Sequence, residues 1–258
     1  MARIPIGLEL YSVRNDLDKD VYGTLKAVAK MGYEGVEFAG PPKHSARVLR
    51  AILDEVGLVC CGWHTPFALV QDDKLAETIA FNKILGNRYV IIPGLPGNVT
   101  GSRANWRKVA DFFNQLTDKL APHGMVTGYH NHHTEFTPLE GEAPWDTFFG
   151  NAAPEVVMQL DTGNALHGGG LSVPVLKRYP GRAKSVHLKP YSPKLVKESE
   201  RAPFGPVIGD DEIPWAEVFR LCETIGGTEW YVVEYESDAY PPLDAVDRCL
   251  KALKKMGK

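Results

Sequence analysis

Four short segments of the sequence end a run of apolar, β-branched residues with carboxylate or imidazole side chains. The segments cover residues 129–136, 159–164, 186–189 and 232–236. Carboxylates and imidazoles are the protein ligands of divalent ions such as Mn²⁺, Mg²⁺, Co²⁺ and Zn²⁺. If the four runs are successive strands, their ends point into one pocket. The motifs therefore predict a metal-dependent enzyme that uses one divalent metal ion (Mn, Mg, Co or Zn).

Length and composition are typical of a globular protein with a full core. The chain has 258 residues, of which 44% are hydrophobic and 24% are charged, and its net charge is −3. This charge gives no support to a nucleic-acid partner. No apolar run approaches the ~20 residues of a membrane span, and no signal-peptide pattern follows Met1. We therefore expect a cytoplasmic protein without a membrane partner, although a protein whose export leader had been removed would look the same.

Strand-like and helix-like segments alternate along the whole chain. The predicted strands cover residues 4–11, 35–38, 58–63, 89–93, 125–130, 156–160, 183–188 and 231–235. The predicted helices cover residues 21–31, 45–56, 74–85, 105–123, 145–150, 173–179, 213–224 and 243–255. In the first helix, Leu25, Val28 and Ala29 form one apolar stripe, and Gly32 provides an end signal.

This alternation predicts an α/β fold, a single (β/α)8 TIM barrel over residues 1–258. Strict alternation implies parallel strands with right-handed crossovers, and continuously apolar strands are typical of strands buried on both faces. Eight units in this length fit a closed barrel better than an open doubly wound sheet. The dinucleotide-binding form of the open sheet also lacks its Gly-x-Gly-x-x-Gly motif after the first strand. The irregular stretch 191–212 is predicted to be a functional loop over the barrel mouth.

Barrel enzymes carry their active sites at the carboxyl ends of the strands, and polar residues recur there in this chain. They are Glu9, Glu37, His64, His130, His132, Asp161, His187, Lys189, Glu234 and Glu236. Residues two apart on a strand share a face. Both members of each of three pairs could therefore point to the barrel axis: His130 and His132, His187 and Lys189, and Glu234 and Glu236. A solvated rim position is the alternative for each residue. Three strands that end alike, at Asp161, His187 and Glu234, favour a metal site, because buried charge is costly unless it is paired or metal-bound.

In order and spacing, these motifs resemble those of the xylose isomerase-like TIM-barrel superfamily, the sugar phosphate isomerase/epimerase family. The resemblance covers essentially the whole chain, through residues 7–14, 32–37, 129–136, 160–164, 187–189 and 209–215. It implies one divalent metal held by Glu, Asp, His and Glu from strands five to eight. Asp161, His187 and Glu234 match three of these positions. The superfamily also contains endonuclease IV, but Asn164 stands near where that enzyme has a second ligand histidine, so a DNA-repair role is discounted.

Strand five is where the chain departs from the family pattern. Many members end this strand with a glutamate, whereas the aligned residue here is His130. Glu135 follows five residues later and is our choice for the fourth ligand, with His130 or His132 as the alternatives. Pro190 stands where the family often has an aspartate after His-Leu-Lys.

The resemblance implies proton abstraction next to a carbonyl, through a metal-stabilised enediolate of a small-molecule carbohydrate substrate. The expected function is a sugar, keto-sugar or sugar-phosphate isomerase or epimerase. A dehydratase or lyase acting on an inosose or keto-glycoside is the alternative, and a non-catalytic sugar-binding barrel is less favoured. The glycine run 168–170 could hold a phosphate at a helix start, but a flexible loop explains it as well. A homo-oligomer is left open.

Individual roles follow from the same resemblance. Glu135 and Glu234 are the acid/base candidates, and His132 could replace Glu135, because imidazoles exchange protons readily near neutral pH. Lys189 could neutralise a substrate oxyanion, or it could simply pair with Glu236. The residues expected to bind substrate are Glu37, His64, His130, Lys189 and Glu236.

Overall fold

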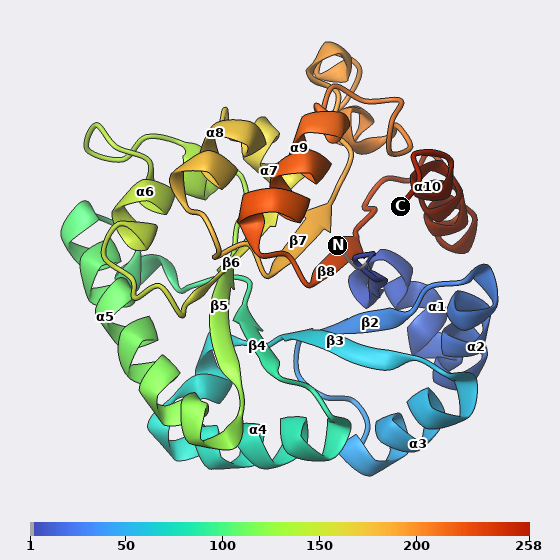
Figure 1. Ribbon diagram of the computed structural model, residues 1–258, viewed down its shortest axis with the longest axis horizontal. Coiled ribbons are helices and arrows are strands. Elements are labelled where there is room, and N and C mark those ends of the chain that lie inside the picture. Colours follow the sequence, from blue (N-terminus) through green and yellow to red (C-terminus); the bar gives the residue numbers. More distant parts are fainter. Residues whose placement is uncertain (1–2) are drawn as a thin grey trace.

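Eight parallel strands close into a barrel in the computed structural model, which describes residues 3–258 (Figure 1). The order around the barrel is the order along the chain, from β1 to β8 and back to β1. The strands are β1 Ile6–Glu9, β2 Gly35–Ala39, β3 Val59–His64, β4 Tyr89–Ile92, β5 Val126–His130, β6 Val157–Asp161, β7 Ser185–Leu188 and β8 Trp230–Val233. The predicted (β/α)8 TIM barrel is confirmed.

Helices form an outer ring around these strands (Figure 1). They are α1 Arg14–Lys19, α2 Val21–Met31, α3 Ala46–Val56, α4 Asp72–Leu85, α5 Arg103–Leu120, α6 Pro144–Phe149, α7 Thr162–His167, α8 Ser172–Arg178, α9 Trp215–Leu221 and α10 Pro242–Lys255. A π-helical turn, Cys222–Gly226, follows α9. None of the helices within residues 3–258 combines the length and apolarity that crossing a membrane requires.

Local capping explains the boundaries of the predicted helices. The side chain of Asp20 accepts a hydrogen bond from Gly23 N and begins α2, which ends at Gly32 with a φ of 103°. Two short helices, α1 and α7, were not predicted. Each has six residues. Helix α7 begins directly at the end of β6, where Asp161 is its N-cap residue.

The core has two parts, and only one of them lies inside the barrel. The larger part fills the space between strands and helices, as in Val36, Leu160 and Val186. The smaller part is an apolar cluster of Tyr89, Ile91 and Val157, with Val126 and Trp230 packed against it. Most of its members begin their strands, so it closes the amino-terminal end of the barrel. The carboxyl end is left for polar side chains.

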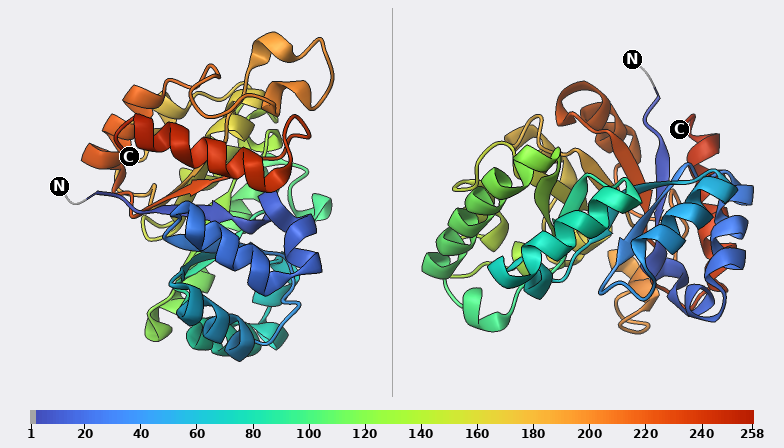
Figure 2. Two further views of the ribbon diagram at one scale, coloured as in Figure 1. Left: turned by 90° about the vertical axis from the view of Figure 1, so that its right-hand side faces the viewer. Right: turned by 90° about the horizontal axis from the view of Figure 1, so that it is seen from below.

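The predicted mouth loop after β7 contains two short 3₁₀ turns, Pro193–Leu195 and Ala202–Phe204. A backbone hydrogen bond from Ser192 N to Pro203 O, 2.7 Å long, folds the segment back on itself. In the right-hand view of Figure 2 this orange segment lies beyond the strand ends. It brings the Phe204 ring to 5.3 Å from Lys189 Nζ. The ring therefore lies over one of the polar side chains at the carboxyl end of the barrel.

Candidate metal and active site

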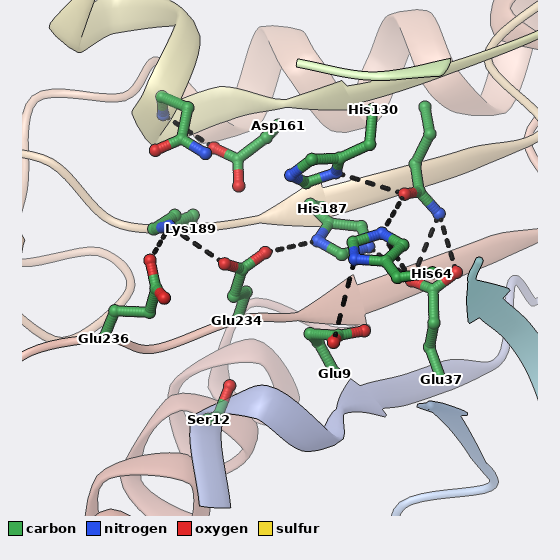
Figure 3. A network of polar contacts seen from close by, with 12 residues as sticks. Glu9, Ser12, Glu37, His64, His130, Asp161, His187, Lys189, Glu234 and Glu236 are labelled. Carbon is green, nitrogen blue, oxygen red and sulfur yellow. Dashed lines mark hydrogen bonds and ion pairs between the residues drawn. The ribbon is translucent and has the colours of Figure 1, made fainter. Parts of the chain in front are cut away.

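Four side chains from the ends of β5 to β8 meet at the barrel axis (Figure 3). Each of His130, Asp161, His187 and Glu234 offers one ligand atom, and these atoms all lie within 4.8 Å of one another. All four residues are buried. Strand register brings them together, because Asp161 pairs with His187 and His187 with Val232, two residues before Glu234. We call these four residues the ligand cluster.

Asp161 carries an open coordination position in the ligand cluster. Its Oδ1 accepts a 2.6 Å hydrogen bond from Asn164 N, whereas its buried Oδ2 has no hydrogen-bond partner among the described residues. Burial raises the pKa of this carboxyl group to about 8. A buried carboxylate oxygen beside two imidazoles and a second carboxylate fits a divalent cation such as Zn²⁺, Mn²⁺ or Co²⁺. The residues present therefore fit the metal that the sequence predicts.

Lys189 compensates the charge of Glu234. Its Nζ donates to Glu234 Oε1 at 2.9 Å and also pairs with Glu236. Burial by itself would lower the pKa of Lys189, but Glu234, Asp161 and Glu236 raise it above its ordinary value. Burial would likewise raise the pKa of Glu234, but Lys189 and His187 hold it well below its ordinary value. Of the two sequence alternatives for Lys189, the structure contains the salt bridge.

A second layer of polar side chains lies deeper in the barrel and orients the imidazoles. Glu37 Oε2 is 2.6 Å from His187 Nε2, and Gln159 Nε2 donates to both Glu37 oxygens at 3.0 and 3.1 Å. The Gln159 carbonyl therefore faces the other way, toward His64 Nε2 at 2.6 Å and His130 Nδ1 at 3.1 Å. The other ring nitrogen, His187 Nδ1, lies 2.6 Å from Glu234 Oε2. A metal ion bound between these two atoms would replace the proton that they share, and Glu37 would then hold the second ring nitrogen, which is a common arrangement for metal-binding histidines.

This layer determines the tautomers of His64 and His130. A carbonyl oxygen only accepts, so His130 Nδ1 donates to Gln159 and leaves the lone pair of Nε2 free. Burial lowers the pKa of His130 well below its ordinary value, so its ring is neutral, as a metal ligand must be. By the same argument, the lone pair of His64 Nδ1 is free and faces Glu9 Oε1 at 3.8 Å.

Glu37 was predicted to contact the substrate, and the structure gives it another position. The residue is 0% exposed, and both carboxylate oxygens are occupied by Gln159 and His187. Its side chain therefore orients His187 instead of contacting a substrate. Gln159 was missed altogether, because a single glutamine inside an apolar strand carries no signal of its own.

Glu135 was predicted to be the fourth ligand and an acid/base, and the structure does not bring it to the cluster. Its oxygens accept hydrogen bonds from Tyr129 Oη at 2.9 Å and His132 N at 2.7 Å. The Tyr129 ring packs among Trp106 and Phe148, on the helix side of β5. Residues 129 and 130 point to opposite faces of the strand, so Glu135 lies on the side away from the axis.

Glu9 is a site residue to which the sequence assigned no role. It is 1% exposed, and neither of its oxygens has a hydrogen-bond partner among the described residues. Burial, together with the neighbouring Glu37 carboxylate, raises the pKa of Glu9 well above its ordinary value. The pairing of Glu9 with Glu37 in the barrel register is the signal that could have indicated it.

One cleft of about 870 Å³ opens onto these residues from outside. The polar residues that line it include Glu9, His64, His130, His132, Glu234 and Glu236. His132 is exposed, with its ring centroid 5.3 Å from that of His130. The predicted substrate contacts His64, His130 and Glu236 thus reach the cleft, whereas Glu37 and Lys189 do not line it.

The glycine run 168–170 offers no phosphate site. The N–H groups of Gly168, Gly169 and Gly170 donate to Asn164 O, Leu166 O and Ala165 O, at 3.0, 3.1 and 2.7 Å. A Cβ on Gly168 would lie 2.1 Å from His133 O, and one on Gly170 would lie 2.2 Å from the Phe136 ring. Gly168 and Gly170 are there because the chain passes close to the turn after β5, and Gly169 adopts a φ of 86° that favours glycine.

Gly62 provides a direct test of the deeper layer. A Cβ at this position would lie 2.1 Å from Glu37 Oε1, so Gly62→Ala must displace the carboxylate from His187. Loss of such an orienting group typically costs about 10–100-fold in metal affinity. We expect this loss in a metal titration of Gly62→Ala. Gly97→Ala is the control for a changed glycine, because nothing lies within 4 Å of a Cβ there and its φ is not positive. Equal metal affinity of Gly62→Ala and the wild type would contradict the orienting role of Glu37.

Comparisons with known proteins agree with the barrel fold. A family model described as xylose isomerase-like TIM barrel matches residues 25–256. The inosose dehydratase of Klebsiella pneumoniae subsp. pneumoniae is 27% identical over 243 residues, which cover 82% of this chain and 81% of that protein. The crystal structure of a sugar phosphate isomerase/epimerase from Parabacteroides distasonis has a TM-score of 0.81 at 23% identity and covers 98% of this chain and 94% of that chain. The structure of IOLI protein with a binding zinc atom has a TM-score of 0.74 at 16% identity, and the match covers 98% of this chain and 97% of that chain.

Proposed function

The chain belongs to the xylose isomerase-like TIM barrel family, and we propose that it is a divalent-metal-dependent dehydratase of a cyclic keto-polyol of the inosose type. The observation that carries the proposal is the ligand cluster with its open Asp161 oxygen. Relatives that are 24–27% identical and named inosose dehydratases support loss of water over the isomerase or epimerase reaction placed first from the sequence. The structures named isomerase or epimerase are less than 25% identical to this chain, and they support the fold alone.

His130, Asp161, His187 and Glu234 would hold the ion, with Glu37 orienting His187. A divalent ion bound there would supply Lewis-acid polarisation of the substrate carbonyl. Lys189 and His187 lower the pKa of Glu234, which suits a metal ligand or a base better than a proton donor. Because Glu135 does not reach the ligand cluster, His132 is the remaining candidate for the base on the side of β5.

Two cleft residues are placed to move the protons of a dehydration. His132 is exposed to the cleft and takes the proton from the carbon next to the carbonyl. The electron pair of that C–H bond first moves toward the carbonyl oxygen as an enolate. When the carbonyl re-forms, the pair becomes the new C=C bond and the C–O bond to the β-hydroxyl breaks. Glu9 retains its proton because burial and Glu37 raise its pKa, so it can donate that proton to the departing hydroxyl, which leaves as water. Strand β1 lies across the barrel from β5, so acid and base reach the ligand from opposite sides.

The experiment incubates metal-loaded protein with a panel of inososes and ketoses in D₂O and follows deuterium and product mass. Deuterium exchange at the α-carbon together with loss of one water is the expected result. Exchange with an isomeric product and no water loss would favour an isomerase or epimerase instead. Tight binding without exchange across the panel would contradict an enzyme of this class. Glu9→Gln is the matched variant, and we expect it to keep metal and α-exchange but to lose most of the dehydration.

A further inference from the structure

We propose that the substrate carries a neutral apolar or aromatic substituent on its keto-polyol ring, and that this substituent lies on the loops after β1 to β4. The inference rests on the proposed function, since it takes the polyol ring to lie at the ligand cluster. The surface in question is a shelf of partly exposed apolar side chains in the wall of the cleft. It is formed by Tyr11, Pro41, Pro42, Pro66, Phe67, Pro93, Leu95 and Pro96.

The barrel mouth is divided between two kinds of surface. Strands β5 to β8 supply the ligand cluster, together with Lys189 and Glu236. The loops after β1 to β4 supply the shelf, in which five of the eight members are prolines. One continuous cleft contacts both, because Glu9, Glu234 and His132 line it along with Tyr11 and Phe67. A substrate bound at the ligand cluster therefore has the shelf beside it.

The size of the cleft exceeds the needs of a single sugar ring. Its volume of about 870 Å³ lies near the top of the range of about 300–1,000 Å³ for cavities that enclose drug-sized ligands. A bare six-membered polyol would occupy only the charged end. It would leave the shelf in water, although apolar surface gains free energy when it is covered.

The shelf is also held in place before a ligand arrives. Tyr11 is 43% exposed, and the Arg14 guanidinium lies 4.1 Å from its ring centroid and donates to Tyr11 O at 2.7 Å. Trp63 Nε1 donates to Gly40 O at 2.8 Å, which fixes the loop that carries Pro41 and Pro42. A fixed aromatic ring in a cleft wall that also contains prolines suits a flat apolar ring, since aromatic rings gain from stacked and edge contacts.

The charges around the cleft favour a neutral substituent over a phosphate. Glu9 lines the cleft as a neutral carboxyl group, and Glu234 and Glu236 line it with Lys189 as their counter-ion. Arg14 is engaged with Tyr11, and Lys43 at the rim is paired with Asp18 at 2.5 Å. The glycine run that could have held a phosphate has its N–H groups occupied. No unengaged lysine or arginine lines the cleft within residues 3–258.

The test compares an inosose with its mono-phenyl ethers by calorimetry on the metal-loaded protein, with each hydroxyl position phenylated in turn. We expect at least one phenyl ether to bind about tenfold tighter than the parent ring. Tyr11→Ala and Phe67→Ala should each remove most of that gain and change binding of the parent ring less than about twofold. Ile84→Ala is the control, because Ile84 is 42% exposed on α4 and does not line the cleft.

The proposal is overturned if every phenyl ether binds no tighter than the parent ring, or if the shelf variants weaken both ligands equally. Circular dichroism checks the fold of each variant. Tyr11→Ala removes an exposed ring and decides the outcome alone if Phe67→Ala does not fold. Shelf-dependent binding without α-exchange or water loss would contradict the proposed function and leave this inference standing. Dehydration of the parent ring without shelf-dependent binding would support the proposed function and contradict this inference.

Discussion

His130→Gln is expected to weaken divalent-metal binding at least about 100-fold, whereas Glu135→Gln should change it less than about twofold. The free Nε2 lone pair of His130 belongs to the ligand cluster. Glu135 accepts hydrogen bonds from Tyr129 and from His132 N on the far side of β5. Isothermal titration of the metal-free protein with Zn²⁺ and Mn²⁺ measures both affinities.

The two substitutions form a matched pair, because they introduce the same residue at positions five apart in one segment. Glutamine at position 135 retains an acceptor oxygen for Tyr129, so the fold around α6 should persist. The opposite ranking, with metal lost from Glu135→Gln and retained by His130→Gln, would restore Glu135 as the ligand. It would also require the turn after β5 to rearrange in the metal-bound protein.

Lys189→Met is expected to lower the free energy of unfolding of the metal-free protein by about 3–5 kcal/mol, because it leaves a buried carboxylate without its cation. Lys189 is 2% exposed, and its ammonium group contacts Glu234 and Glu236. Urea unfolding in the presence of a chelator measures the loss. A saturating divalent ion should recover part of it, because the ion neutralises Glu234 in place of the ammonium group.

Lys251→Met is the control for loss of a paired lysine. Lys251 pairs with Asp247 one turn away on α10, and its side chain is 67% exposed. A surface pair of this kind contributes about 0.3–0.5 kcal/mol. Similar urea midpoints for the two variants would mean that Lys189 is not the counter-charge of the ligand cluster. A loss of stability that metal does not reduce would separate Lys189 from the metal site.

Much of the scaffold was predictable because its signals are local. The apolar runs, the glycines that end helices and the caps act within a few residues, and the strand ends follow from them. The positions of Asp161, His187 and Glu234 at three such ends could therefore be read along the chain. The structure brings these three residues together through parallel register between neighbouring strands.

The sequence by itself determined the barrel, its eight units and the residues at the strand ends. Only the tertiary structure decided how deep each side chain lies and what it contacts. Glu37 and Glu9 are paired in the register of β1 and β2, yet Glu37 is held by Gln159 and His187, whereas Glu9 has no hydrogen-bond partner among the described residues. Glu135 is drawn to Tyr129 by the turn that follows β5. These differences depend on the stagger of strands around a closed barrel and on contacts between distant loops. Residue spacing cannot encode either, since it reports only which face of its own strand a side chain takes.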